Sequence, residues 1–163
     1  MQAADADDDG KASSTELNAY LERVTPQYVD GIMLTGDGSQ IMLKTITKQV
    51  TTLPGVGGLQ TLRVEADFAG ALPTNNSSTL HRLSFEDTNH RARIGWHELV
   101  VAPAAGVTVF NSSAFGNAVT NELRAYPKNM LTAPLDERTA QLSWTTGAVP
   151  AEAVALRMHD VAP

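Results

Sequence analysis

Short runs of alternating apolar and polar residues, separated by turn signals, dominate the chain from Gly31 onward. Gly36-Asp37-Gly38 has the composition of a hairpin turn between two of these runs. The expected strands are 32–34, 40–46, 45–52, 59–68, 80–85, 94–101, 107–110 and 138–145. About seven or eight short strands with turns between them are typical of a sandwich. We therefore expect residues 31–147 to form a mainly β domain, an antiparallel immunoglobulin-like sandwich.

The run 59–68 shows the alternation best. One face of the expected strand carries four apolar residues, Leu62, Val64, Ala66 and Phe68. The opposite face carries three charged residues, Arg63, Glu65 and Asp67. Successive side chains of a strand point to opposite faces, so this pattern predicts a strand with one buried face.

An amphipathic helix is expected before Gly31. Its apolar stripe has the spacing i, i+3, i+4, i+7 and consists of Leu17, Tyr20, Leu21 and Val24. Ser13 and Glu16 have the spacing of a capping box at its start. Pro26 predicts either the end of this helix or the start of a second short one.

Three other segments read as connections. Residues 72–78 predict a polar turn, and residues 117–126 predict one or two helical turns that end at Pro127. After Gly147, several Ala residues and two Pro residues predict a linker over 148–163.

Twelve consecutive residues, from Asp5 to Glu16, fill every required position of the EF-hand calcium-loop pattern D-x-[DN]-x-[DN]-G-x5-E. Calcium is a hard cation that takes six to eight oxygen ligands at roughly 2.3–2.6 Å. The predicted ligands are carboxylate, carbonyl and hydroxyl oxygens of Asp5, Asp7, Asp9, Lys11, Ser13 and Glu16. Gly10 permits the sharp bend of the loop, and Glu16 is expected to close the site with two oxygens. Segment 1–30 is therefore predicted to be a Ca2+ loop with its exiting helix.

Two features depart from the usual pattern. Ala12 stands where a large aliphatic residue usually pairs with a partner loop, and only four residues precede Asp5. A lone loop of this kind should bind calcium weakly, toward the ~10⁻⁴–10⁻³ M range of extracellular modules. The simpler alternative is an acidic helix N-terminus, where the helix dipole favours carboxylates. That alternative does not explain the three alternating Asp residues, the Gly and the final Glu.

Composition excludes several classes of function. The net charge of −6 argues against a nucleic-acid surface, which needs clustered Lys and Arg. The absence of Cys excludes disulfides, thiolate zinc sites and cysteine nucleophiles. No stretch approaches the ~20 apolar residues that span a bilayer, so we expect no direct membrane insertion by this chain. The chain begins almost inside a motif and shows no signal peptide, which favours a piece of a longer protein.

Two other kinds of chemistry remain open alternatives. His90 and His97 lie on neighbouring expected strands and, with a carboxylate, could hold nickel or cobalt. A hydrolase would need a nucleophile such as Ser112 or Ser113, but no G-x-S-x-G elbow is present. We favour a protein that is not an enzyme.

Arg93, Trp96 and Glu98 have two interpretations. They form a partner-facing patch, or else Trp96 belongs to the core and Arg93 pairs with an acid such as Asp87. We favour the second interpretation, because large aromatic residues in strands are usually buried.

Several longer motifs follow the calcium loop in a fixed order. They are Glu16-Leu17-Asn18-Ala19-Tyr20, Gly57-Gly58-Leu59-Gln60-Thr61-Leu62-Arg63, Asp87-Thr88-Asn89, Arg93-Ile94-Gly95-Trp96-His97-Glu98-Leu99-Val100, Asn121-Glu122-Leu123-Arg124-Ala125-Tyr126-Pro127 and Leu131-Thr132-Ala133-Pro134-Leu135-Asp136-Glu137-Arg138. This order resembles the N-terminal extracytoplasmic domain of bacterial high-affinity nickel/cobalt transporter family proteins.

The resemblance implies a place and a partner for the chain. It implies an accessory domain outside the cytoplasm, tethered to the cell membrane, whose partner is the transmembrane portion of the same polypeptide. The family's transport signature, a His- and Asp-bearing pattern in a membrane helix, is absent from these residues.

Overall fold

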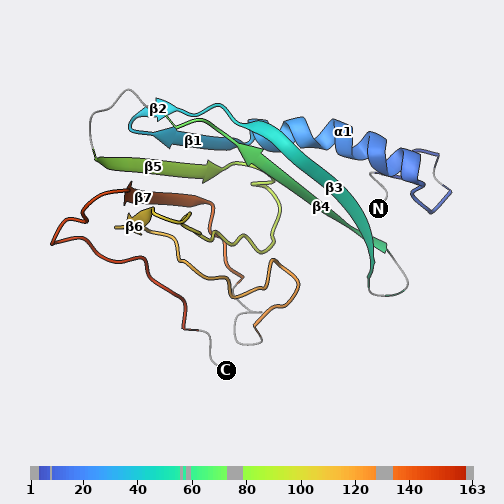
Figure 1. Cartoon of the computed structure of the whole chain (residues 1–163). Coiled ribbons are helices and arrows are strands. Elements are labelled where there is room, and N and C mark those ends of the chain that lie inside the picture. Colours follow the sequence, from blue (N-terminus) through green and yellow to red (C-terminus); the bar gives the residue numbers. More distant parts are fainter. Residues whose placement is uncertain are drawn as a thin grey trace. The chain divides into compact units, whose positions relative to one another are not determined.

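The computed structural model describes residues 4–7, 9–55, 57, 60–72, 79–127 and 134–160. It is mainly β with antiparallel sheets, as predicted, and the described part contains one helix (Figure 1). The elements are α1 (Ser14–Asp30), β1 (Ile32–Gly36), β2 (Ser39–Gln40), β3 (Lys44–Pro54), β4 (Gln60–Ala69), β5 (Leu80–Asp87), β6 (Thr108–Phe110) and β7 (Thr139–Thr145).

The chain divides into two compact units that are each discontinuous in sequence. Unit 1 comprises Met1–Gly31 and Met42–Ala71, and unit 2 comprises Ile32–Ile41 and Leu72–Pro163. Unit 1 therefore holds α1 with β3 and β4, and unit 2 holds the other five strands. This grouping differs from the segments 1–30 and 31–147 expected from the sequence, because β3 and β4 group with the helix.

The predicted capping box opens α1. Ser13 is the N-cap; its hydroxyl accepts from the Glu16 N–H, and the Glu16 side chain accepts from the Ser13 N–H. The apolar stripe is confirmed, with Leu21 and Val24 buried. The prediction for Pro26 is wrong, because α1 continues through it to Asp30.

Burial on the face of α1 explains why Pro26 does not end the helix. Proline removes one backbone donor, a cost that neighbouring contacts must offset. Thr25, next to Pro26, is 1% exposed, and its hydroxyl donates to the Leu21 carbonyl at 2.7 Å. The packed face and this side-chain bond keep the last turn helical.

Strands β3 and β4 form a two-stranded sheet beside α1 (Figure 1). Directly opposite residues share a face, so Val50 and Val64 belong to an apolar face and Gln49 and Glu65 to a polar one. Lys48 lies on the apolar face and pairs with Glu22 of α1 at 2.5 Å, which places the helix over that face. The strand predicted over 59–68 is confirmed as β4, but its predicted buried face is not, because Arg63 and Glu65 of the polar face are half-buried like the apolar residues. Its apolar side chains are only half-buried, since one helix covers two strands incompletely.

The other five strands form one antiparallel sheet of order β2-β1-β5-β7-β6. The predicted hairpin turn is confirmed, because Thr35 and Gly36 pair with Gln40 and Ser39 around Asp37-Gly38. Both turn residues have positive φ, +48° and +83°, as a type I′ turn requires. The expected strand 40–46 does not form as one piece: β2 ends at Gln40, and β3 begins at Lys44 in the other unit.

The core of unit 2 lies around β6 and β7. The buried apolar side chains there include Val109, Phe110, Ala140 and Leu142. Strand β5 pairs with β7 over seven residues, from Leu80↔Thr145 to Glu86↔Thr139. The predicted strands 80–85, 107–110 and 138–145 are therefore confirmed within one or two residues.

Two predicted elements of unit 2 are wrong. Residues 94–101 make only isolated bridges, His97↔Asp136 and Val100↔Phe115. Residues 117–126 form no helix, because Asn121, Glu122 and Leu123 have φ of +48°, +58° and +60°. These are left-handed conformations, which apolar spacing cannot predict. The polar turn predicted for 72–78 lies almost wholly outside the described residues.

The segment expected as a linker makes ordered contacts in unit 2. The Asn111 N–H donates to the Val154 carbonyl at 2.8 Å, and the Gly116 N–H donates to the Arg157 carbonyl at 2.9 Å. A Cβ on Gly116 would lie 2.8 Å from Met158 Sδ, so a larger residue there would displace the Met158 side chain. Residues 154–159 thus pack along residues 110–117.

Candidate metal centre

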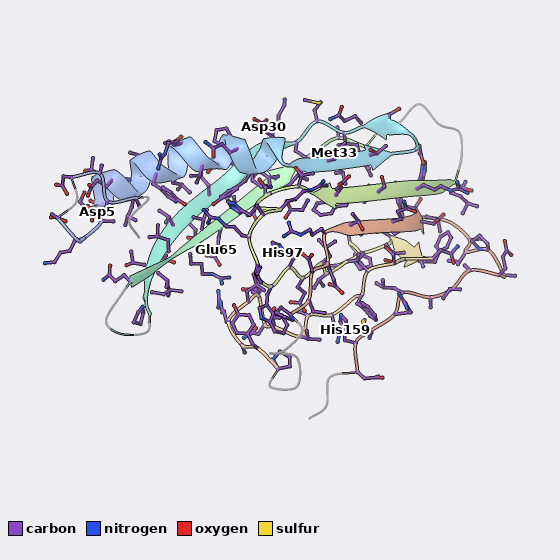
Figure 2. The ribbon with its side chains drawn as sticks, turned by 180° about the vertical axis from the view of Figure 1, so that it is seen from behind. Asp5, Asp30, Met33, Glu65, His97 and His159 are labelled. Atoms are coloured by element: carbon purple, nitrogen blue, oxygen red, sulfur yellow. The ribbon has the colours of Figure 1, made fainter. Side chains whose placement is uncertain are left out.

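The first three acids of the predicted calcium loop come together in unit 1. One carboxylate oxygen from each of Asp5, Asp7 and Asp9 lies within 4.8 Å of the other two. The cluster sits at the amino end of α1, whereas Asp30 lies at the carboxyl end (Figure 2). Within the described residues this is the only group of three or more Asp, Glu, His or Cys side chains with such spacing.

Backbone N–H groups orient the three carboxylates. Asp5 Oδ2 accepts from the Gly10 N–H at 2.9 Å, and Asp9 Oδ1 accepts from the Lys11 N–H at 2.8 Å. Asp7 Oδ1 accepts from the Asp9 N–H at 3.3 Å. Gly10 has φ of +84°, the bend at which the pattern places glycine. The loop is therefore curled around its acids by local hydrogen bonds.

One oxygen of the cluster lacks a partner. Asp5 Oδ1 is buried and accepts no hydrogen bond in the structure. A buried, unpaired carboxylate oxygen costs free energy unless a donor or a cation satisfies it. Three carboxylates form an all-oxygen, strongly anionic donor set, which suits a hard divalent cation such as Ca2+ or Mg2+. The residues present therefore fit a hard divalent cation, without selecting Ca2+ over Mg2+.

Glu16, the last predicted ligand, is not part of the cluster. Its Oε1 accepts from the Ala6 N–H at 2.7 Å, and its Oε2 accepts from the Ser13 N–H at 2.8 Å. The Ser13 hydroxyl donates to the same Oε2 at 2.7 Å. The Ser13 contacts first, then the Ala6 N–H, lower the pKa of Glu16 from 4.5 to about 2. The structure thus shows Glu16 holding the two ends of the loop together.

Lys11 and Ser13 keep the positions that the pattern requires. Lys11 is exposed, and the pattern uses only its backbone carbonyl. Ser13 is occupied by the capping box. Sequence reasoning thus found the three clustered acids and, from the capping-box spacing, the bonding between Ser13 and Glu16.

His90 and His97 do not form a metal cluster in the described residues. Arg138 Nη2 lies 2.6 Å from His97 Nε2, and because arginine can only donate, this nitrogen accepts. The lone pair that a nickel ion would use is therefore engaged by a cation. His90 is exposed, with φ of +51°, and belongs to no group of three ligands.

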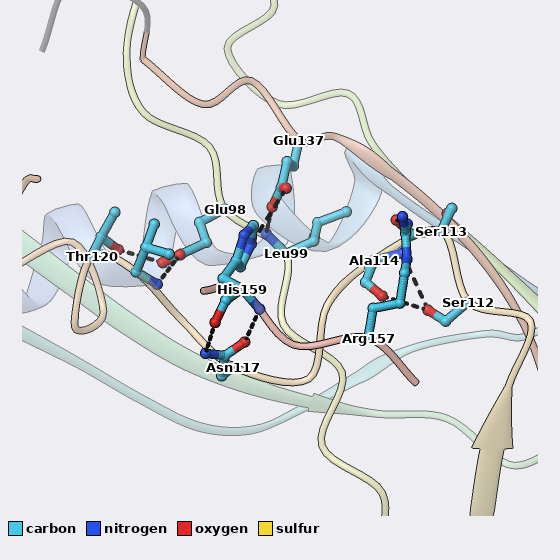
Figure 3. Close-up of polar contacts among 11 residues, drawn as sticks. Glu98, Leu99, Ser112, Ser113, Ala114, Asn117, Thr120, Glu137, Arg157 and His159 are labelled. Carbon is cyan, nitrogen blue, oxygen red and sulfur yellow. Dashed lines mark hydrogen bonds and ion pairs between the residues drawn. The ribbon is translucent and has the colours of Figure 1, made fainter. Parts of the chain in front are cut away.

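The two serines considered for a hydrolase bond to the backbone. The Ser112 hydroxyl donates to the Ala114 carbonyl at 2.8 Å (Figure 3). The Ser113 hydroxyl accepts from the Gln141 N–H at 3.0 Å. The nearby His159 stacks on Phe115 at 3.7 Å between ring centres. Asn117 bonds its backbone N–H and carbonyl, so this histidine is part of the docked C-terminal segment.

A second ordered histidine was missed by sequence reasoning. His81 Nδ1 lies 2.7 Å from Asp37 Oδ2, and the ring stacks on Trp144 at 4.3 Å. Asp37 Oδ1 also accepts from the Arg82 N–H at 2.8 Å. Only the register of β1, β5 and β7 brings these residues together, so no local signal could have predicted the pair.

Comparison of the chain with protein-family models, curated proteins and solved structures gives no match. The described residues include no helix that combines the length and the apolar character needed to cross a bilayer. The resemblance to the nickel/cobalt transporter family therefore stays a prediction from the motifs quoted above.

Proposed function

We propose that residues 5–16 bind one Ca2+ ion and that the ion stabilises the N-terminus of α1. The observation that carries this proposal is the buried, unpaired Asp5 Oδ1 inside a cluster of three carboxylates. A cation there would satisfy that oxygen and neutralise the repulsion among Asp5, Asp7 and Asp9. The role we propose is structural or regulatory rather than catalytic, because the loop follows the pattern of a calcium-binding loop.

The full EF-hand ligand set is the finer form of this proposal. Asp5, Asp7 and Asp9 supply carboxylate oxygens, Lys11 supplies its carbonyl, and Ser13 contributes directly or through water. Glu16 joins them when its carboxylate leaves the Ser13 and Ala6 N–H groups. The immunoglobulin-like sandwich is likewise the finer form of the β-sheet architecture, supported by the short antiparallel strands.

The cellular role follows from the sequence motifs. We assign the chain as an extracytoplasmic calcium-binding accessory domain of a membrane nickel/cobalt transporter-like protein. Its partner is the transmembrane portion of the same polypeptide. The weak affinity expected for a lone loop suits the calcium concentrations outside the cytoplasm.

Calorimetric titration of the chelator-stripped chain with CaCl2 tests the calcium site. One site in or below the millimolar range is expected, and Asp5→Asn should weaken it by about tenfold, since ligand charge sets the affinity. Asp30→Asn removes one carboxylate from the opposite end of the same helix, so it is the matched control and should bind as the parent does. No heat at millimolar calcium contradicts the proposal.

Thermal unfolding gives an independent readout. Because calcium binds the folded loop, 100-fold excess over Kd should stabilise the chain by about 2.7 kcal/mol. An unchanged melting temperature with and without chelator contradicts the structural role.

A further inference from the structure

The loop 90–95 of unit 2 exposes an apolar side chain at its tip. Ile94 is fully exposed, and every other residue from His90 to Gly95 is exposed too. Single exposed apolar residues are common on protein surfaces, but a branched residue without any cover loses the most from contact with water. Its sequence neighbours in the loop include Arg91 and Arg93 and no acid.

A cavity of about 260 Å³ lies beside this loop. Three arginines line it, Arg91, Arg93 and Arg138, together with Asp136, and Arg91 is ion-paired with Glu86. Arg138 is fixed in place, since its Nε donates to Asp136 Oδ1 at 2.6 Å and its Nη1 to the Asn89 carbonyl at 2.8 Å. Arg91 and Arg138 are ion-paired, so the charge that favours a bound anion here is that of Arg93, which is in none of the ion pairs of the described residues.

Two aromatic rings lie at the base of the loop. Trp96 follows the tip and packs against Tyr126, with 5.1 Å between ring centres. Trp96 is half-buried and Tyr126 is exposed. Membrane-interface sites are typically composed of partly solvated tyrosine and tryptophan next to Arg and an exposed aliphatic residue.

A buried hydrogen-bond network holds the segment that presents Tyr126. Glu98 accepts from the Val119 N–H at 2.5 Å and from the Thr120 hydroxyl (Figure 3). The same Thr120 hydroxyl accepts from the Leu123 N–H at 3.0 Å, and Thr120 is fully buried. The left-handed turn over 121–123 is therefore anchored, and Leu123 and Tyr126 stay exposed beyond it.

We propose that loop 90–95 and its cavity bind an anionic phospholipid at a membrane surface. The phosphate group occupies the cavity against Arg93, and Ile94 enters the boundary between headgroups and acyl chains. A free phosphate ion uses the arginines but not Ile94, whereas a neutral apolar surface uses Ile94 but not the arginines. Only a ligand with both an anionic headgroup and an apolar region contacts the arginine and Ile94 together. The loop enters the membrane no deeper than the headgroups.

Vesicle sedimentation in chelator tests this proposal without any contribution from the calcium loop. The full chain should sediment with phosphatidylglycerol/phosphatidylcholine vesicles and stay in solution with pure phosphatidylcholine. The chain's net charge of −6 opposes general attraction to anionic vesicles, so sedimentation reports a local site. Trp96 fluorescence should shift to shorter wavelength on binding, because its surroundings lose water.

Matched variants separate the two parts of the site. Arg93→Gln should weaken binding by about fivefold, the effect of one cation near an anionic surface. Ile94→Ser should weaken it by about tenfold, the loss of one buried aliphatic side chain. Met42→Ser in unit 1 removes another exposed apolar side chain and should bind as the parent does.

Three results overturn the proposal. They are no sedimentation with anionic vesicles, equal losses in Met42→Ser and Ile94→Ser, and binding of inorganic phosphate alone without vesicle binding. The last result reassigns the cavity to a free anion. Calcium binding is measured separately, so its failure and the failure of this proposal are distinguishable.

Discussion

Two glutamates, one in each unit, do the same physical task in different settings. Glu16 accepts from the N–H groups of Ala6 and Ser13 at the start of α1, and Glu98 accepts from the Val119 N–H and the Thr120 hydroxyl. Glu16 bonds to Ser13, three residues away, whereas Glu98 reaches 21 and 22 residues along the chain. The comparison teaches that a carboxylate cap is predictable when its partner is local and invisible when its partner is distant.

Removing each glutamate should lower the free energy of unfolding by a different amount. Glu16 accepts from loop N–H groups that water can reach. When Glu16 is removed, water therefore replaces many of its hydrogen bonds. Glu98 serves a buried hydroxyl, so its removal leaves donors without a partner. Three measurements sharpen or break this comparison.

Glu98→Ala should have the largest effect on stability. Leaving the Val119 N–H and the Thr120 hydroxyl unpaired should lower the free energy of unfolding by about 2 kcal/mol. Glu122→Ala removes an exposed carboxylate from the same segment and is expected to cost within about 0.5 kcal/mol. Urea unfolding of both variants makes the comparison, and equal losses would show that Glu98 is no anchor.

Ser13→Ala should have the next largest effect. Removing the N-cap hydroxyl should cost about 1 kcal/mol, measured in chelator so that calcium does not contribute. Ser14→Ala changes the first helical residue instead and should be nearly neutral. If both variants unfold at the same denaturant concentration as the parent, the capping box does not stabilise α1.

Lowering the pH, with chelator present, should have the smallest effect on the free energy of unfolding. The pKa of Glu16 is lowered to about 2, so its contribution to stability is fully present above 4.5 and is lost as the pH falls toward 2. The glutamine side chain of Glu16→Gln does not titrate, so this variant lacks the pH dependence that Glu16 contributes. The difference in unfolding free energy between parent and variant should be constant above pH 4.5 and shrink below it. A difference that stays constant down to pH 2 excludes the charged cap.

The lesson extends to the rest of the fold. The Asp37-Gly38 hairpin and the strand predicted over 59–68 come from local signals, and the structure confirms both elements. The turn over 121–123 uses the same positive φ as the hairpin but carries Asn, Glu and Leu rather than glycine. Its conformation is over-determined by Thr120 and Glu98, and that support comes from another part of the chain.

The candidate sites divide in the same way. Asp5, Asp7 and Asp9 are spaced so that one bend brings them together, and the twelve-residue pattern predicts their clustering. Arg93 and Arg138 line one cavity although they are far apart in sequence, and the preferred pairing of Arg93 with Asp87 is not among the ion pairs of the described residues. Trp96 is half-buried, between the two interpretations that the sequence left open.

By itself the sequence determined what depends on a few neighbouring residues. These features are the helix with its cap, the hairpin turn, the alternating strands and the curled acidic loop. Tertiary structure alone decided that α1 runs through Pro26, that β3 and β4 group with the helix, and that Glu98 anchors a left-handed turn. The physical reason is that burial and hydrogen bonds between distant segments outweigh local propensities of a few tenths of a kcal/mol to about 1 kcal/mol per residue.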